Sequence, residues 1–236
     1  MPFEIVVDAV ADRGYAALAT VDLGADAASI FRRDPRTLPS AASRALAAAL
    51  RAHPGDALVL QGWPLRAPSV QALAAPPVAT AIRTPWAALL AEFAPLEPAP
   101  ASAHDLLATR LPPLLTALWA PLGAPPPPLR IVDCRPLGPQ GRAMQLGGVL
   151  TVATSLATPE HALLQVFHEA THPVTDPAVH ARLGASEPRA THRDAPGFAT
   201  HRALEAAAVA YGTAVLEVAA PELLPAWSTW RRRWGA

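Results

Sequence analysis

Hydrophobic residues recur at two spacings along this chain, and each spacing predicts a different kind of element. Short apolar runs that are rich in β-branched residues and bounded by turn-forming residues favour strands. Four runs fit that description: 3–7, 56–61, 129–134 and 146–154. The last two are separated by the turn-rich segment 136–141. The chain therefore carries enough strand signal for a small sheet.

Other parts of the chain repeat apolar residues every three or four positions, as amphipathic helices do. Capping residues and proline mark the expected helix starts. The expected helices are Ser40 to about Arg51, Thr84-Pro85 to about Phe93, and Ser102 to Pro112-Pro113. The segment 64–77 is expected to be a loop. A last helix is expected at about 221–234, where Trp227, Trp230 and Trp234 share one face and predict a packing stripe or a homodimer contact.

Prolines alternate with small residues at 95–101, which is typical of a linker between domains. We therefore expect an N-terminal α/β lobe of unknown role over residues 1–97 and a second domain over 98–236. The fold class predicted for the whole chain is α+β.

The sequence His-Glu-Ala-Thr-His at 168–172 carries the strongest chemical signal. Thr158-Pro159-Glu160 is typical of a helix start, and Pro173 predicts that the helix ends near His172. On that helix His168 and His172 lie one turn apart on the same face. Two imidazoles placed in this way can hold one zinc ion, and Glu169 can act as general base on a metal-bound water.

This segment resembles the motif of the zincin metallopeptidases, and its surroundings resemble the gluzincin branch of that family. The resemblance covers about the C-terminal half of the chain. It implies a minimal catalytic domain made of a small sheet, the motif helix and a later helix that supplies a glutamate ligand. Glu205, 33 residues after His172 in an alanine-rich helical stretch, is the best candidate for that ligand. It also implies that the strand Gly148–Thr154 is an edge strand that pairs with an extended peptide substrate. An ordinary interior strand is the alternative that the residues leave open.

The function implied is hydrolysis of peptide bonds through a zinc-bound water, with a peptide or protein as substrate. A donor must then stabilise the developing oxyanion. Tyr211, His201 and His192 are the candidates, and His201 lies one helical turn before Glu205. The rivals of Glu205 as third ligand are His180, His192, Asp194, His201 and Glu217.

The polar segment 173–197 is expected to be a long loop, and a loop there could cover the metal. Asp176 and Asp194 lie in it. Either carboxylate could orient a ligand imidazole through its second ring nitrogen, although loop aspartates more often cap or turn the backbone. His161 is expected to be exposed.

Composition excludes several function classes. Formal net charge is zero, so we expect no nucleic-acid partner and no anionic membrane surface. All the basic side chains are arginine, which together with abundant alanine and proline suggests a GC-rich bacterial genome. No secretory signal or membrane-spanning run is visible, and Cys134, the single cysteine, is expected to be a buried structural thiol. A cytoplasmic enzyme is the expectation.

Two other hypotheses use the same residues. A peptidase-like binding module would keep the fold without catalysis. A non-metal interaction protein would use residues 160–215 only as a helical packing unit.

Overall fold

The computed structural model describes residues 3–23, 39–94, 101–138, 141–183 and 197–232 of the 236-residue chain. These residues form an α+β structure with many helices and one mixed sheet, which confirms the predicted fold class. The chain separates into two compact units. Unit 1 contains Met1–Pro2, His104–Pro128 and Pro159–Ala236, and unit 2 contains Phe3–Ala103 and Leu129–Thr158.

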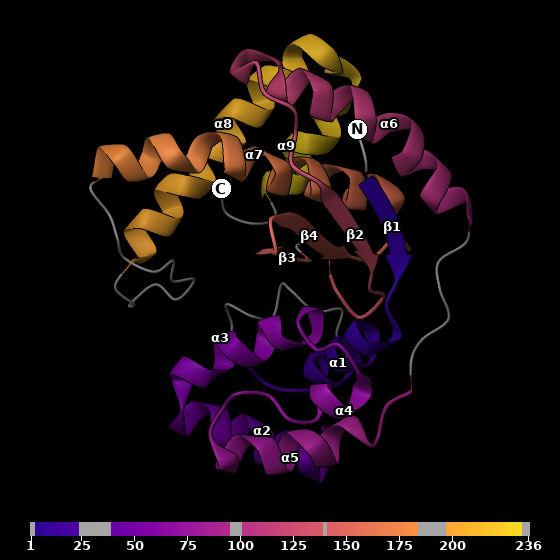
Figure 1. Ribbon diagram of the computed structural model, residues 1–236, viewed down its shortest axis with the longest axis vertical. Coiled ribbons are helices and arrows are strands. Elements are labelled where there is room, and N and C mark those ends of the chain that lie inside the picture. Colours follow the sequence, from indigo (N-terminus) through magenta and orange to yellow (C-terminus); the bar gives the residue numbers. More distant parts are fainter. Residues whose placement is uncertain (1–2, 24–38, 95–100, 139–140, 184–196, 233–236) are drawn as a thin grey trace. The chain divides into compact units, whose positions relative to one another are not determined.

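Unit 2 holds the sheet, whose strand order is β1 (Phe3–Val7), β2 (Leu129–Asp133), β4 (Val149–Thr154) and β3 (Arg142–Leu146). The first three strands are parallel, and β3 runs antiparallel to β4. Figure 1 shows β1 beside β2, although more than a hundred residues separate them in the sequence. The strand predictions at 3–7 and 129–134 are confirmed.

The pairing of β1 with β2 joins the two predicted domains into one sheet. The compact units therefore differ from the predicted division into 1–97 and 98–236, because unit 2 takes strands from both ranges. The expected linker at 95–101 lies almost entirely outside the described residues. Parallel pairing over such a distance leaves no local signal in the sequence.

A two-residue turn, Gly147-Gly148, joins β3 to β4. Both glycines have positive φ, 57° and 82°. A type I′ hairpin turn needs positive φ at both central residues, which glycine adopts without strain. The predicted strand 146–154 therefore starts only after this turn, and the sequence did not predict β3.

The expectation that Gly148–Thr154 forms an edge strand is wrong. β4 lies between β2 and β3, so within the described sheet the edges are β1 and β3. Leu150, Val152 and Ala153 of β4 are buried, as an interior strand requires. Residue type alone could not reveal this, because a strand's partners come from distant segments.

The described part of unit 2 also contains five α-helices, which lie together in Figure 1: α1 (Ala9–Ala19), α2 (Ala41–Ala52), α3 (Pro54–Gly62), α4 (Val70–Leu73) and α5 (Thr80–Leu90). Polar side chains cap the first two. Asp8 accepts from the backbone N–H groups of Val10 and Ala11, and Ser40 accepts from that of Ser43. The predicted helix starting at Ser40 is confirmed.

Three local predictions in this unit need correction. Residues 56–61, expected as a strand, lie in α3, because Pro54 occupies its first turn and Asp56 adds a carboxylate near its N-terminus. The helix expected after Thr84-Pro85 starts earlier, at Thr80. The loop expected at 64–77 contains α4 and part of the 3₁₀ turn Trp63–Leu65.

The core of unit 2 combines helix and sheet residues. Leu46, Trp86 and Val132 belong to one cluster of buried apolar side chains. The Trp86 indole N–H donates to the carbonyl of Leu73 at 2.7 Å, so its one polar atom is satisfied inside the core. Cys134 is buried in the same cluster, and burial raises the pKa of its thiol well above the usual value. The prediction of a buried structural thiol is confirmed.

The described helices of unit 1 are α7 (Pro159–Leu183), α8 (Phe198–Ala219), α9 (Leu224–Arg232) and, from His104 on, α6 (Ala101–Trp119). Pro221–Leu223 form a 3₁₀ turn before α9. α7 packs against α8, and α9 contacts both. α6 runs through Pro112 and Pro113, so the expected interruption there is wrong. The Thr116 hydroxyl, one turn after Pro112, donates to the Pro112 carbonyl at 3.0 Å.

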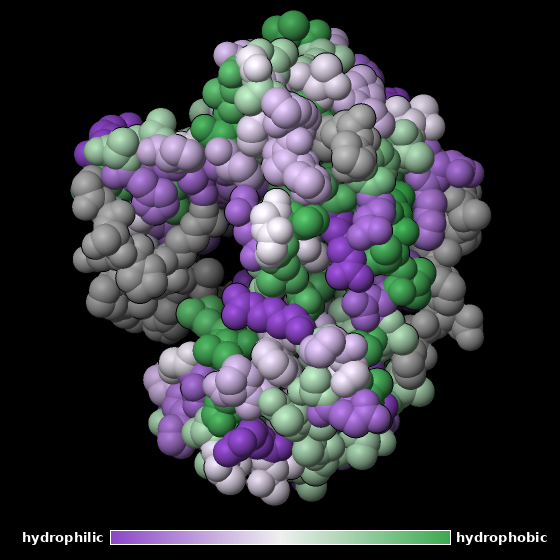
Figure 2. Space-filling model, in the orientation of Figure 1, coloured by the Kyte–Doolittle hydropathy of each residue, from purple (hydrophilic) through white to green (hydrophobic). Residues whose placement is uncertain are grey.

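No described helix is both long and apolar enough to cross a bilayer. Figure 2 shows hydrophobic and hydrophilic residues mixed over the visible face of α2 to α5.

Gly14 provides a test of the packing in unit 2. A Cβ at Gly14 would lie 2.8 Å from Cγ of Pro64, a rigid ring that cannot rotate away, whereas a Cβ at Gly55 would meet nothing within 4 Å. We expect Gly14→Ala to lower the free energy of unfolding by ~1–3 kcal/mol through overpacking. Gly55→Ala should keep or raise it, because alanine favours helix. Urea unfolding of both variants measures the difference, and equal stabilities would contradict this packing.

Candidate metal centre

α7 places the two motif histidines. The helix starts at Pro159, as predicted, with Glu160 in its first turn, where a carboxylate favours the helix dipole. His168 and His172 then lie one turn apart on a face that points into unit 1, and their exposed fractions are only 5% and 6%. Buried imidazoles need polar partners, and these come from α7 itself and from a second helix.

The prediction that Pro173 ends this helix is wrong. α7 continues through Pro173 and Pro177 to Leu183. The segment 173–183 is therefore helix and not the expected loop, and 184–196 lie outside the described residues. As a consequence His172 has helix on both sides, and Asp176 follows it one turn later on the same face.

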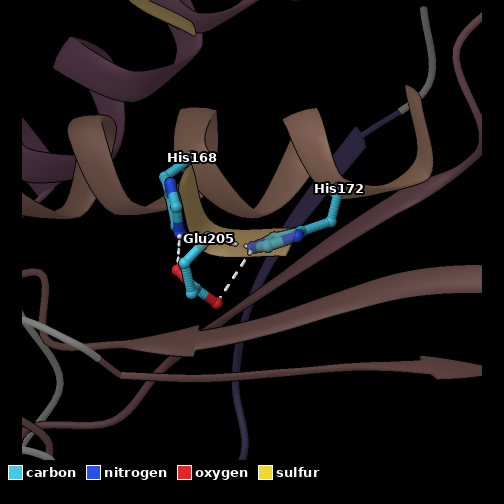
Figure 3. A group of neighbouring side chains, drawn as sticks. All are labelled: His168, His172 and Glu205. Atoms are coloured by element: carbon cyan, nitrogen blue, oxygen red, sulfur yellow. Dashed lines mark hydrogen bonds and ion pairs between the residues drawn. The ribbon is translucent and has the colours of Figure 1, made fainter. Parts of the chain in front are cut away.

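α8 brings the carboxylate. Figure 3 shows His168 and His172 reaching from α7 toward Glu205, which comes from the neighbouring helix. Glu205 Oε2 lies 3.0 Å from His168 Nε2, and Glu205 Oε1 lies 3.5 Å from His172 Nε2. The two Nε2 atoms are 3.3 Å apart. The structure therefore brings together the three predicted ligands, and one donor atom from each lies within 4.8 Å of the others.

The separations between these donor atoms can be compared with those in a tetrahedral metal site. In a tetrahedral site with metal–ligand bonds of about 2.0–2.1 Å, neighbouring donor atoms lie about 3.3–3.4 Å apart. The observed separations, 3.0, 3.3 and 3.5 Å, are close to that value. Two imidazoles and one carboxylate are also donors that zinc accepts. The group could hold a metal ion.

Electrostatics favour the ionised form of Glu205, which is the form that binds a metal. Burial alone would raise the pKa of its carboxyl, but the hydrogen bond from His168 and the charges of His168, His172 and His201 lower it to about 2. Glu205 therefore stays ionised over the physiological pH range. An ionised carboxylate is required for metal coordination.

Asp176 lies where it can orient one ligand. Its Oδ1 is 3.0 Å from Nδ1 of His172, and both side chains are largely buried. Since a carboxylate accepts, Asp176 favours the His172 tautomer that carries its proton on Nδ1, and this tautomer leaves the lone pair of Nε2 toward the cluster. Of the two aspartates named from the sequence, Asp176 is therefore placed to orient a ligand imidazole. Asp194 lies outside the described residues.

His201 lies beside the cluster, and Tyr211 does not join it. His201 Nδ1 is 3.8 Å from Glu205 Oε1, one turn away on α8. The Tyr211 hydroxyl instead donates to the carbonyl of Leu118 in α6 at 2.7 Å. Six residues after Glu205, Tyr211 is rotated about 120° from it around the helix. Tyr211 therefore ties α8 to α6, and its candidacy as an oxyanion donor is not supported.

Glu169 follows the first ligand and is partly exposed. The amide Nε2 of Gln165, one turn earlier, donates to its carboxylate in a long hydrogen bond of 3.4 Å. Sequence reasoning missed Gln165. The available signal was its spacing, since residues four apart meet on a helix surface.

The rival ligands are not part of the described cluster. Glu217 is exposed near the end of α8, and His180 lies two turns after His172 on α7. His192 is outside the described residues. Within the described part of the chain, no other group of histidine, cysteine or acidic side chains could hold a metal ion in this way.

Comparisons with family models, with curated proteins and with solved structures find no match for this chain.

The third ligand is tested by Glu205→Gln. We expect zinc binding to weaken more than about 100-fold, because changes outside the ligand shell already cost ~10–100-fold. Glu217→Gln, on the same helix but exposed, is the matched control and should bind zinc like the wild type. Competition with a chromogenic chelator measures both dissociation constants. Equal affinities in the two variants would remove Glu205 from the site.

A second substitution tests the orienting carboxylate. Asp176→Ala should weaken zinc binding by ~10–100-fold while leaving the stoichiometry at one ion, because the His172 ring loses the acceptor for its Nδ1–H. Asp176→Asn should be weakened less, because its amide oxygen can still accept. If Asp176→Ala binds zinc as tightly as wild type in the same titration, the carboxylate does not act through His172.

Proposed function

We propose that this protein is a zinc-dependent metallopeptidase in which His168, His172 and Glu205 hold the metal. The observation that carries the proposal is the convergence of these three donors, from two different helices, at separations that suit a tetrahedral ion. The helix that provides both histidines also provides Glu169, next to the first ligand. The likeness to gluzincins noted from the sequence agrees with this donor set.

Bound zinc would supply Lewis-acid chemistry, because it lowers the pKa of water toward neutrality and polarises a carbonyl group. Glu169 is the proposed general base: it takes a proton from the attacking water and passes it to the amine as the C–N bond breaks. His201 is the remaining candidate among the described residues for a donor to the developing oxyanion. Asp176 keeps the His172 ring in its productive tautomer.

The proposed substrate is a peptide or protein. The neutral net charge gives no reason to expect nucleic acid as a partner.

Zinc is the proposed metal. The same donor set also suits a second metal, so the identity of the ion is a separate test. Two histidines and one carboxylate also form the facial ligand set of non-haem Fe(II) sites. Mass spectrometry of protein purified both aerobically and anaerobically, followed by reconstitution with each metal, identifies the ion. Protein that retains iron and rejects zinc would rule out the zinc peptidase.

Glu169→Gln tests the catalytic step. The variant should keep one zinc ion per chain and lose peptide hydrolysis by ~10²–10⁴-fold, the usual contribution of a general base. Glu160→Gln, exposed on the same helix, is the control and should keep full activity. Cleavage of a broad peptide library, read by mass spectrometry, measures turnover.

The same experiment separates the alternatives. Zinc-loaded wild type that cleaves no peptide would favour a peptidase-like binding module. Cleavage that survives Glu169→Gln would remove the proposed base. A wild type that takes up no metal, with a fold unchanged by His168→Ala, would leave the helices as a packing unit only.

A further inference from the structure

The two ligand histidines differ at the ring nitrogen that faces away from the cluster. His172 Nδ1 has a carboxylate partner, Asp176, at 3.0 Å. His168 Nδ1 is buried and has no hydrogen-bond partner within the described residues. A metal ligand histidine ordinarily gives its second N–H to a carboxylate, a carbonyl or a water. His168 therefore needs another source of orientation.

The lack of a partner for His168 Nδ1 matters when Nε2 of the same ring binds a metal. His168 Nε2 faces the cluster, 3.0 Å from the Glu205 carboxylate and 3.3 Å from His172 Nε2. A metal held by Nε2 would leave the N–H of the ring on Nδ1. The N–H would then occupy a buried position where no described oxygen accepts it. A buried N–H without a partner opposes binding.

Two stacked indoles lie against His168. The ring centre of Trp230 is 5.3 Å from that of His168, and the ring centre of Trp227 is 6.1 Å away. The two indoles are nearly parallel, at 15°, with centres 5.3 Å apart. Both come from α9 and are almost fully buried, with exposed fractions of 0% for Trp227 and 5% for Trp230.

The indole pair is held in place by unit 1 itself. Trp227 Nε1 donates to the Thr213 hydroxyl of α8 at 2.9 Å, and its ring meets Phe167 of α7 edge-on at 5.8 Å. These contacts fix the pair from both neighbouring helices. The tryptophan stripe predicted from the sequence is thus a packing stripe inside the chain for these two residues, and Trp234 lies outside the described residues.

An aromatic face carries negative charge density and attracts cations and N–H groups, most strongly for tryptophan. An imidazole bound to a divalent ion carries part of its positive charge. We propose that Trp230, stacked on Trp227, takes the place of the missing acceptor for His168 and so makes α9 a positioning element of the metal centre. This inference rests on the proposed metal site and adds to it residues from a third helix.

The test compares metal affinity with stability. Zinc dissociation constants and unfolding temperatures, with and without zinc, are measured for wild type, Trp230→Leu and Trp230→Phe. Trp230→Leu should bind zinc roughly 3- to 30-fold more weakly, the range that a cation–π contact represents, and Trp230→Phe should lie between it and wild type. The zinc-induced rise in unfolding temperature should shrink in the same order.

A shape-preserving replacement separates charge from packing. Tetrafluorinated tryptophan in place of Trp230 keeps nearly the same ring size but removes the negative charge density of the face, so zinc affinity should again fall several-fold. Leu216→Ala, a packing loss elsewhere on α8, is the control: its unfolding temperature should fall with and without zinc while its zinc affinity stays unchanged.

The outcomes are distinguishable. Wild type that binds no zinc would refute the proposed metal site itself. Wild type that binds zinc, together with an unchanged affinity in the fluorinated protein, would refute only the role of Trp230. The fluorinated protein decides the question even if Trp230→Leu fails to fold.

Discussion

The interaction on which the site depends is the approach of two imidazole nitrogens and one carboxylate inside the contact between α7 and α8. Electron-rich atoms that lie 3.0–3.5 Å apart repel one another unless a proton or a cation lies among them. A proton between His168 Nε2 and Glu205 would do this for two of the three groups. A divalent ion would do so for all three residues together, which is why the arrangement suits metal binding better than a simple hydrogen bond.

The packing of unit 1 is arranged to allow this approach. A Cβ at Gly212 of α8 would lie 3.2 Å from the Trp227 ring, 3.3 Å from Phe167 and 3.5 Å from Thr171. A side chain at this position would press against both neighbouring helices. Glycine therefore lets α8 lie close to α7 and α9, and that closeness brings Glu205 within reach of the histidines.

Local sequence rules failed where helix packing opposed them. Pro173 follows His172 directly, and a proline lacks an N–H and disfavours helix in the residue before it, so an end to the helix was the natural prediction. α7 nevertheless continues to Leu183. Most helix stability in a folded protein comes from packing an apolar face, and this can outweigh the loss of individual backbone hydrogen bonds. The same reasoning applies to Pro112 and Pro113 in α6.

The sequence by itself predicted the donor set of the candidate site: a spacing of four put His168 and His172 on one helix face, and the resemblance to gluzincins made Glu205 the best candidate for the carboxylate. Helical periodicity and capping are local properties, so they can be read directly. Only the tertiary structure decided that Glu205 meets the histidines, that Asp176 contacts one of them, that Tyr211 turns away, and that β4 is an interior strand. Those outcomes depend on which distant segments pack together, and the free energy of that packing is shared over the whole unit and not carried by any short stretch of sequence.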